Sequence, residues 1–305
     1  MTEDSLLIAK AILELKQGPD IVKDYVFPIS ISFLSALLGG MTAYWFNLRQ
    51  ERVKSEKEKF LLANKLVITV IECSNALVSI KGNYISLNST DPRKRALSIP
   101  YIINNESDAN FDMALYSFIK NVPTCNIGFL GKIKKFIEYR ILGMNCLGPS
   151  DEEIGKSWRN INRMSACIKN YNLFITLLSK RNELDGQVKS AFKKYVEVTH
   201  EEIMSNTPRS ILVPYIGLTE TIIALNDHLI KEMDSFLNEF PLIAESNIEL
   251  SLVGKGSKVI SIKNAKPGYI NILNPIVKPD YKLLAKLMGV SHDEVIKMYT
   301  FSDWY

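Results

Sequence analysis

The sequence has few of the residues that indicate a chemistry. Its 305 residues include three histidines and four cysteines. The cysteines form no CxxC pair, so neither a zinc knuckle nor a disulfide scaffold is indicated. The 37 basic and 33 acidic side chains leave a net charge of only +4, which is too small an excess to be typical of nucleic-acid binders. A content of 23% charged and 47% apolar residues excludes a disordered or fibrous chain.

Local catalytic and metal motifs are also missing. The sequence contains no GxSxG, Walker, Rossmann or kinase signature. His200 precedes two glutamates, but an HExxH zinc motif needs a second histidine at position 204, where methionine stands. His228 and Glu232 share a helix face, and a salt bridge explains their spacing more simply than a metal does. We therefore predict a protein that is not an enzyme and that needs no cofactor and no metal.

The longest charge-free stretch lies near the N-terminus. It runs from residue 26 to residue 48, VFPISISFLSALLGGMTAYWFNL, and contains 23 residues. About 20 apolar residues in a helix cross the hydrocarbon core of a bilayer. Pro28, the Gly39-Gly40 pair and the serines suit a membrane helix better than a helix in water. We predict a transmembrane helix over residues 26–48; a buried helix of a soluble protein and an interfacial segment are the alternatives.

The flanks of this stretch predict its orientation. Tyr44 and Trp45 fall near its C-terminal end and are followed by Arg49 and Arg52, an arrangement typical of a membrane interface. Residues 1–25 contain three lysines and five acids, whereas residues 49–65 contain six Lys or Arg and three Glu. Positive charge favours the cytoplasmic side. We expect most of the chain to lie in the cytosol.

Small residues follow two rows along one face of the predicted span. The rows are Ser32, Ala36 and Gly40, and Ser35, Gly39 and Ala43. Small side chains let a second helix approach closely, which is how membrane helices associate. The strip predicts self-association or a helical partner in the bilayer. Chance is the alternative, because small residues are common in such helices.

The rest of the chain predicts a mainly α fold in several segments. Residues 1–25 form an amphipathic segment, residues 49–81 a helical stalk, residues 82–245 a helical bundle, and residues 246–305 a small C-terminal module. Within the bundle, residues 82–105 indicate a solvated loop with the basic cluster Arg93-Lys94-Arg95; binding of phosphate or anionic lipid there is the alternative. Helical patterns follow at residues 107–122, 127–146, 151–181, 187–204 and 210–240.

One of these helices is apolar enough to consider as a second span. Residues 211–225, ILVPYIGLTETIIAL, are 15 in number and include Glu220. A lone carboxylate in lipid is costly, and the stretch is short for a bilayer. We predict a buried cytosolic helix; a two-span hairpin is the alternative.

The C-terminal module changes pattern. Residues 248–253 and 258–263 alternate apolar and polar side chains around a Gly-Lys-Gly-Ser turn, which predicts a β-hairpin, and residues 269–273 suggest a third strand. Residues 281–299 resemble a helix-turn-helix through Ala285, Gly289 and Val295. The second helix starts Ser-His-Asp-Glu, which suits a capping box and not base reading. A helical hairpin without sequence-specific DNA binding is expected, with a docking surface for a partner formed by Tyr299, Phe301, Trp304 and Tyr305.

The layout of anchor, stalk and cytosolic body resembles the membrane-anchored effectors of bacterial antiviral systems. The resemblance is carried by residues 28–59, PISISFLSALLGGMTAYWFNLRQERVKSEKEK, and points to the transmembrane effector encoded beside some retron reverse transcriptases. It implies a protein of the bacterial inner membrane. A cytosolic complex of a reverse transcriptase and its DNA would hold it inactive, and its release would damage the membrane.

Two other functions agree with the same residues. A passive scaffold or tether would use the span only to hold a cytosolic complex at the membrane. A membrane-bound regulator would use the C-terminal helix-turn-helix-like hairpin on DNA.

Overall fold

The computed structural model describes residues 3–16, 21–103, 108–120, 151–190, 199–262 and 267–301. These residues are mainly helical, as predicted, and contain no strand. The chain separates into two compact units, Met1–Glu56 and Lys57–Tyr305. Helix α2, Phe27–Gly82, begins in the first unit and ends in the second.

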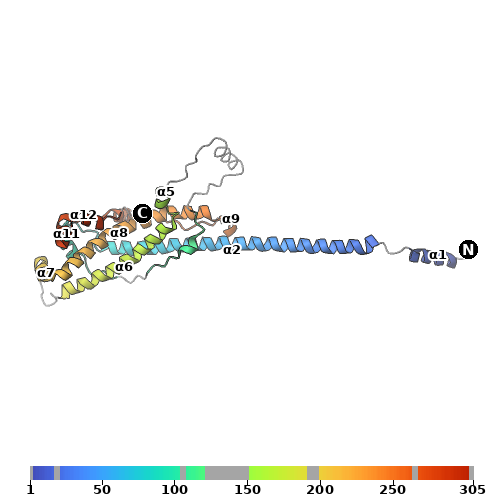
Figure 1. Ribbon diagram of the computed structural model, residues 1–305, viewed down its shortest axis with the longest axis horizontal. Helices are drawn as coiled ribbons and strands as arrows, with labels where there is room; N and C mark the ends of the chain where they lie inside the picture. Colours follow the sequence, from blue (N-terminus) through green and yellow to red (C-terminus); the bar gives the residue numbers. More distant parts are fainter. Residues whose placement is uncertain are drawn as a thin grey trace, which may run out of the picture. The chain divides into compact units, whose positions relative to one another are not determined.

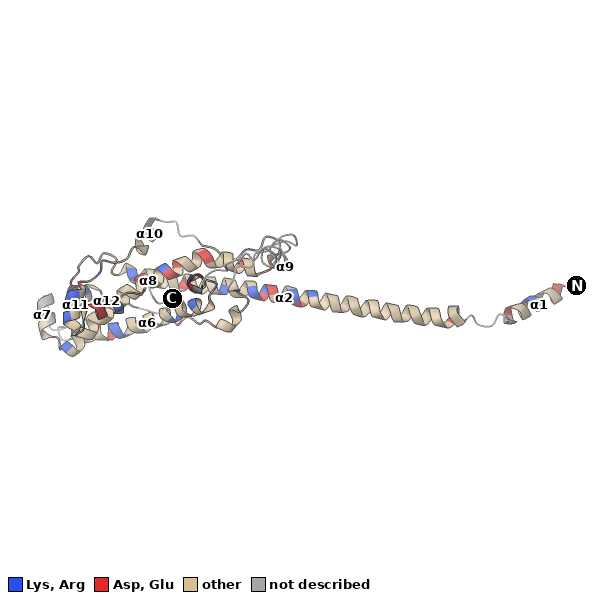
Figure 2. Ribbon diagram, turned by 45° about the horizontal axis from the view of Figure 1, so that its top comes forward, with Lys and Arg blue, Asp and Glu red and all other residues tan. Residues whose placement is uncertain are grey.

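The first unit contains the charge-free stretch. Its elements are α1 (Glu3–Lys16), the π-helical turn η1 (Val22–Val26) and the first half of α2. Residues 27–48 of α2 carry no charge, and Figure 2 shows this part of the helix as a run of uncharged residues. The helix is long and apolar enough to cross a membrane, and none of its apolar window is buried. A core helix of a soluble protein would be mostly buried.

The second half of α2 is part of the body. The helix continues to Gly82 without a break, as predicted. We expected residues 49–81 to form a stalk ahead of the bundle, but Ala63, Val67, Val70 and Leu77 are almost fully buried. Ala63, Val70 and Leu77 recur every seven residues, and this seven-residue repeat forms a core face because it packs with residues of α6 and α8.

The core of the second unit lies between three long helices. In Figure 1 the C-terminal half of α2 runs alongside α6 (Ile161–Ser190) and α8 (Arg209–Asn247). Phe174, Leu229 and Phe240 are fully buried among them. Trp158 meets Phe236 edge to face, with ring centroids 5.1 Å apart. Residues 215–225 of α8 are also largely buried, which confirms the prediction of a buried helix there.

Short elements connect and cover the long helices. They are α3 (Pro92–Ser98), the 3-10 turn η2 (Met113–Tyr116), α5 (Asp151–Lys156), α7 (His200–Asn206), α9 (Leu250–Val253), α10 (Pro267–Leu273), α11 (Tyr281–Met288) and α12 (His292–Met298).

The predicted β-hairpin is wrong. Residues 250–253 form the helical turn α9, residues 269–273 belong to helix α10, and residues 258–262 are extended without a strand partner among the described residues. Side chains on neighbouring helices accept the backbone hydrogen bonds that a partner strand would accept. The N–H of Val259 donates to Glu245 Oε1 at 2.9 Å, and the N–H of Ile260 donates to Asn64 Oδ1 at 2.8 Å. Within residues 258–262 only Val259 is buried, whereas Ile260 and Ile262 are exposed, so the alternation of apolar and polar residues does not mark one buried side.

One predicted helix has a different structure, and another lies outside the described residues. Over residues 108–120 the structure has only the 3-10 turn η2. The Asn172 side chain accepts from the N–H of Ala109 and donates to its carbonyl, both at 2.9 Å. This pairing takes the place of helical hydrogen bonds. The helix predicted over residues 127–146 lies outside the described part of the chain.

The C-terminal helical hairpin agrees with its sequence signals. Asp280 caps α11, and Gly289 ends it with φ of 73°, a left-handed conformation that favours glycine. Ser291 and Glu294 form the predicted capping box at the start of α12. Helices α11 and α12 pack together and against α8.

Candidate functional site

Two of the small residues of α2, Ala36 and Gly40, line a shallow apolar groove. The groove is lined by Phe33, Ala36, Leu37, Gly40, Met41 and Tyr44. A Cβ added to Gly39 or Gly40 would meet no atom within 4 Å, so packing among the described residues does not explain the glycines. The hydroxyl of Thr42 donates to the Leu38 carbonyl at 2.7 Å, which satisfies this polar group within the helix. Ser32, Ser35, Ala43, Tyr44, Trp45, Arg49 and Arg52 are likewise exposed.

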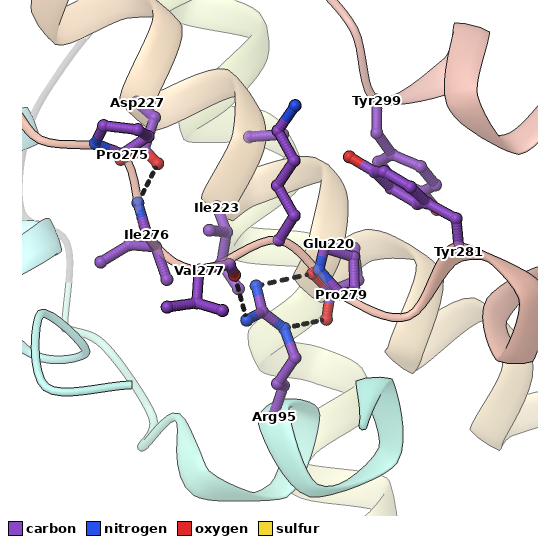
Figure 3. Close-up of a pocket in the computed structure, with 12 residues that line it drawn as sticks. Arg95, Glu220, Ile223, Asp227, Pro275, Ile276, Val277, Pro279, Tyr281 and Tyr299 are labelled. Carbon is purple, nitrogen blue, oxygen red and sulfur yellow. Dashed lines mark hydrogen bonds and ion pairs between the residues drawn. The ribbon is translucent and has the colours of Figure 1, made fainter. Parts of the chain in front are cut away.

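A buried ion pair joins α3 to α8. Arg95 Nε lies 2.7 Å from Glu220 Oε1 and Arg95 Nη2 lies 2.9 Å from Glu220 Oε2, so the pair is bidentate. The two side chains are 1% and 2% exposed. Arg95 Nη1 also donates to the carbonyls of Ser89 and Val277. The guanidinium thereby connects three segments that are far apart in the sequence (Figure 3).

A second pair lies at the C-terminal end of α2. Lys81 Nζ is 2.6 Å from Asp227 Oδ1 and donates to the carbonyls of Ile272 and Asn274 at 2.6 and 2.7 Å. Asp227 Oδ2 accepts from the N–H of Ile276 at 2.7 Å (Figure 3). Both pairs thus combine a bond between helices with bonds to the backbone of residues 272–277.

A small pocket lies beside both pairs. Its volume is about 120 Å³, well below that of typical small-molecule sites. Its lining includes the stacked rings of Tyr281 and Tyr299, with centroids 6.5 Å apart. Burial raises the pKa of Glu220, against the lowering effect of Arg95, and burial raises the pKa of Tyr299 to about 12. Each carboxylate is paired with a cation, so the arrangement suits docking of a segment and not proton transfer.

The loop predicted around Arg93-Lys94-Arg95 is wrong. Helix α3 begins at Pro92, and Asp91 caps it by accepting from the N–H of Arg93 at 2.9 Å. Arg95 is fully buried, so it is available to neither phosphate nor lipid. Its partner Glu220 is 125 residues away, which explains why the local sequence does not show the pairing. The sequence did contain one indication of this pairing. Glu220 is a lone carboxylate within an apolar helix, and such a group needs a cation when it is buried.

A second buried arginine, Arg181, holds the end of α3. Arg181 Nη atoms donate to the carbonyls of Pro100, Ala96 and Ile99 at 2.6 to 3.0 Å. The Tyr215 hydroxyl lies 2.7 Å from Asp185 Oδ1, and Asp185 is 3.5 Å from Arg181. This network was not predicted, because its acceptors are backbone carbonyls.

The salt bridge predicted for Glu232 is made with a residue other than His228. Glu232 binds Arg163 of α6, with Nη2 and Oε2 2.9 Å apart, and Arg163 lies over the Trp158 ring at 4.0 Å. His228 instead faces Phe301, with ring centroids 5.9 Å apart. Within the described residues no group of His, Cys, Asp and Glu is arranged to hold a metal. Cys73 and Cys167 are buried, as predicted, and burial raises the pKa of Cys167.

Two of the four aromatic residues of the predicted docking surface are buried. Tyr299 and Phe301 are each only 7% exposed. The Tyr299 hydroxyl donates to the Gly217 carbonyl at 3.3 Å, which fixes the hairpin on α8. Trp304 and Tyr305 lie outside the described residues.

Comparisons with protein-family models, curated proteins and solved structures find no match to this chain. The function proposed below therefore depends on the exposed span and the side-chain contacts described above.

Removal of one partner of the Arg95–Glu220 pair tests its contribution to stability. We expect Arg95→Met to lower the free energy of unfolding by about 3–5 kcal/mol, because it leaves Glu220 buried without a cation. The double variant Arg95→Met/Glu220→Leu recovers at least half of that loss. The measurement is a urea titration of full-length protein in detergent micelles, followed by fluorescence of the buried Trp158 after Trp45 and Trp304 are replaced with Phe.

Arg93→Met is the matched control for this experiment. Arg93 pairs with Asp91 next to it and is 43% exposed, so its loss costs less than about 1 kcal/mol. Equal losses in the Arg93 and Arg95 variants would contradict the assigned role of the buried pair.

The half-buried His228 predicts a pH dependence of stability. Burial lowers the pKa of His228 below its ordinary value of 6.5. Between 6.5 and the lowered pKa the unfolded chain binds a proton that the folded chain does not, so stability falls as pH falls through this window. We expect His228→Gln to reduce that slope, measured by urea titrations between pH 7.5 and 5. Equal slopes in the two proteins would show that His228 does not cause the loss.

Proposed function

We propose that the protein is a membrane-anchored effector of a bacterial antiviral defence system. Helix α2 holds it in the inner membrane, the second unit lies in the cytosol, and release by a cytosolic partner lets it perturb the membrane. The observation that carries this proposal is the charge-free N-terminal part of α2, residues 27–48, together with an apolar window of which no part is buried. Exposure of so much apolar surface to water is unfavourable, and a bilayer removes that cost.

The flanking residues support the same placement. Exposed Tyr44 and Trp45 precede Arg49 and Arg52, the order expected where a helix enters the cytosolic interface. The partner that the resemblance to retron effectors implies is a reverse transcriptase with its DNA. Nothing in α12 favours direct DNA binding, because its first turn carries the exposed acids Asp293 and Glu294.

The strip of small residues supports association of spans. The groove at Ala36 and Gly40 is lined by larger side chains such as Phe33 and Leu37, a shape into which a second helix can pack. In the proposed mechanism, a change in the cytosolic body alters the packing of this strip and lets spans cluster. Clusters of spans would disturb the bilayer.

Membrane insertion and membrane damage are tested together. Full-length protein should sediment with membranes after lysis without detergent. Leu34→Lys/Leu38→Lys should move it to the supernatant, because each charge near the centre of a span costs roughly 3 kcal/mol. Induction of the protein without its partner should depolarise the cells, measured with a potential-sensitive dye, and the lysine variant should not.

The outcomes separate the proposal from its alternatives. Wild-type protein in the supernatant contradicts the anchor itself. Sedimentation with a polarised membrane in every condition contradicts the effector and favours a passive tether. Salt-dependent DNA binding by the full-length protein would favour a membrane-bound regulator.

The groove predicts that bulk at the glycines weakens association. We expect Gly39→Leu/Gly40→Leu to reduce crosslinking of spans in membranes several-fold, because the added side chains block close approach. Leu34→Phe/Leu38→Phe is the control, since it adds bulk on the opposite face of the helix. Unchanged crosslinking in the glycine variant would show that this face is not the contact.

A further inference from the structure

An extended segment crosses the two ion pairs of the body. We call residues 274–280, Asn-Pro-Ile-Val-Lys-Pro-Asp, the strap; it connects α10 to α11 and has no regular secondary structure. Pro275 and Pro279 each fix φ and lack an N–H, which favours an extended course. Figure 3 shows the strap passing over Arg95, Ile223 and Glu220.

The body holds the strap mainly through backbone groups. Lys81 donates to the Asn274 carbonyl and Arg95 donates to the Val277 carbonyl. The N–H of Ile276 donates to Asp227, and the N–H of Asp280 donates to the Thr90 carbonyl at 2.7 Å. Among the side chains of the strap, Ile276 is buried whereas Val277 is 47% exposed.

The charges beneath the strap are paired without it. Lys81 has Asp227 and Arg95 has Glu220, both within the helical body. If the strap leaves, water takes the place of its carbonyls and amides, and no buried charge loses its counter-charge. Loss of the strap's backbone hydrogen bonds therefore costs less than breaking either ion pair.

The hairpin that follows the strap packs in a separate apolar cluster. Leu284, Val295 and Tyr299 contact Tyr215 and Ile216 at the N-terminal end of α8. The main core between α2, α6 and α8 is a different cluster, to which this part of the chain adds only Ile276 and Phe301. Few contacts with the main core are typical of segments that open while the rest of a protein stays folded.

We propose that residues 274–298 are a latch: the strap and the α11–α12 hairpin open as one unit from the folded α2–α6–α8 body and uncover the two ion pairs. The latch does not depend on whether α2 spans a membrane. A partner that binds either the freed hairpin or the uncovered surface shifts the population toward the open state. Opening of the latch uncovers a surface that includes Lys81. This residue lies in the last turn of α2, the helix that begins in the first unit.

Hydrogen exchange measured by mass spectrometry on the full-length protein in detergent micelles tests the latch. Peptides covering residues 274–298 should exchange at one shared rate that is faster than that of peptides from the buried parts of α6 and α8. Exchange of the latch at the rate of the core would overturn the proposal.

Ile276→Pro gives a sharper test, because it removes the N–H that donates to Asp227. Exchange in residues 277–298 should rise roughly ten- to hundredfold, the usual effect of losing a hydrogen bond to a charged group, with α6 and α8 unchanged. Val277→Ala is the matched control: it alters an exposed side chain, keeps the carbonyl and should change nothing. An equal rise in α6 and α8, no rise in the hairpin, or failure of the variant to fold would each overturn the latch.

Discussion

The bidentate contact between Arg95 and Glu220 joins residues that are 125 positions apart, and neither side chain reaches water. A buried charge is tolerated only beside a counter-charge and hydrogen-bonding partners. This requirement brings α3 against α8, and the remaining donor of Arg95 then fixes the strap. Lys81 and Asp227 form a second ion pair of this kind at the C-terminal end of α2. Together the pairs determine how the C-terminal part of the chain lies on the body.

Helix α2 meets two different environments within one continuous element. Residues 27–48 carry no charge and the apolar window of the helix is exposed, whereas the seven-residue repeat of its second half is buried from Ala63 onward. The composition of each half suits its environment. Glycine and serine are poor helix formers in water but tolerated in lipid, while alanine, valine and leucine at heptad spacing suit packing against α6 and α8. Under the proposed function, the first part of α2 lies in lipid and the second half lies in the protein core, which are the environments that their compositions favour.

Local signals were reliable where the interactions that decide the structure are local. The capping box at Ser291, the left-handed Gly289 and the unbroken helix up to Gly82 involve residues within one or two turns of each other. The predicted β-hairpin failed because an alternating pattern of apolar and polar residues does not determine the hydrogen-bond partner of the segment. That partner was a pair of helix side chains, Glu245 and Asn64. Similarly, the predicted docking surface failed because exposure of Tyr299 and Phe301 depends on whether α8 lies next to them.

The sequence by itself determined the charge-free segment, the mainly helical composition and the places where helices start and stop, because hydropathy and capping act over a few residues. Only the tertiary structure decided that Arg95 is buried, that the second half of α2 is core, and that residues 274–280 lie over two ion pairs. Those facts depend on counter-charges, backbone carbonyls and apolar faces supplied by segments as much as 190 residues away. No local pattern in the sequence records which distant group will meet them.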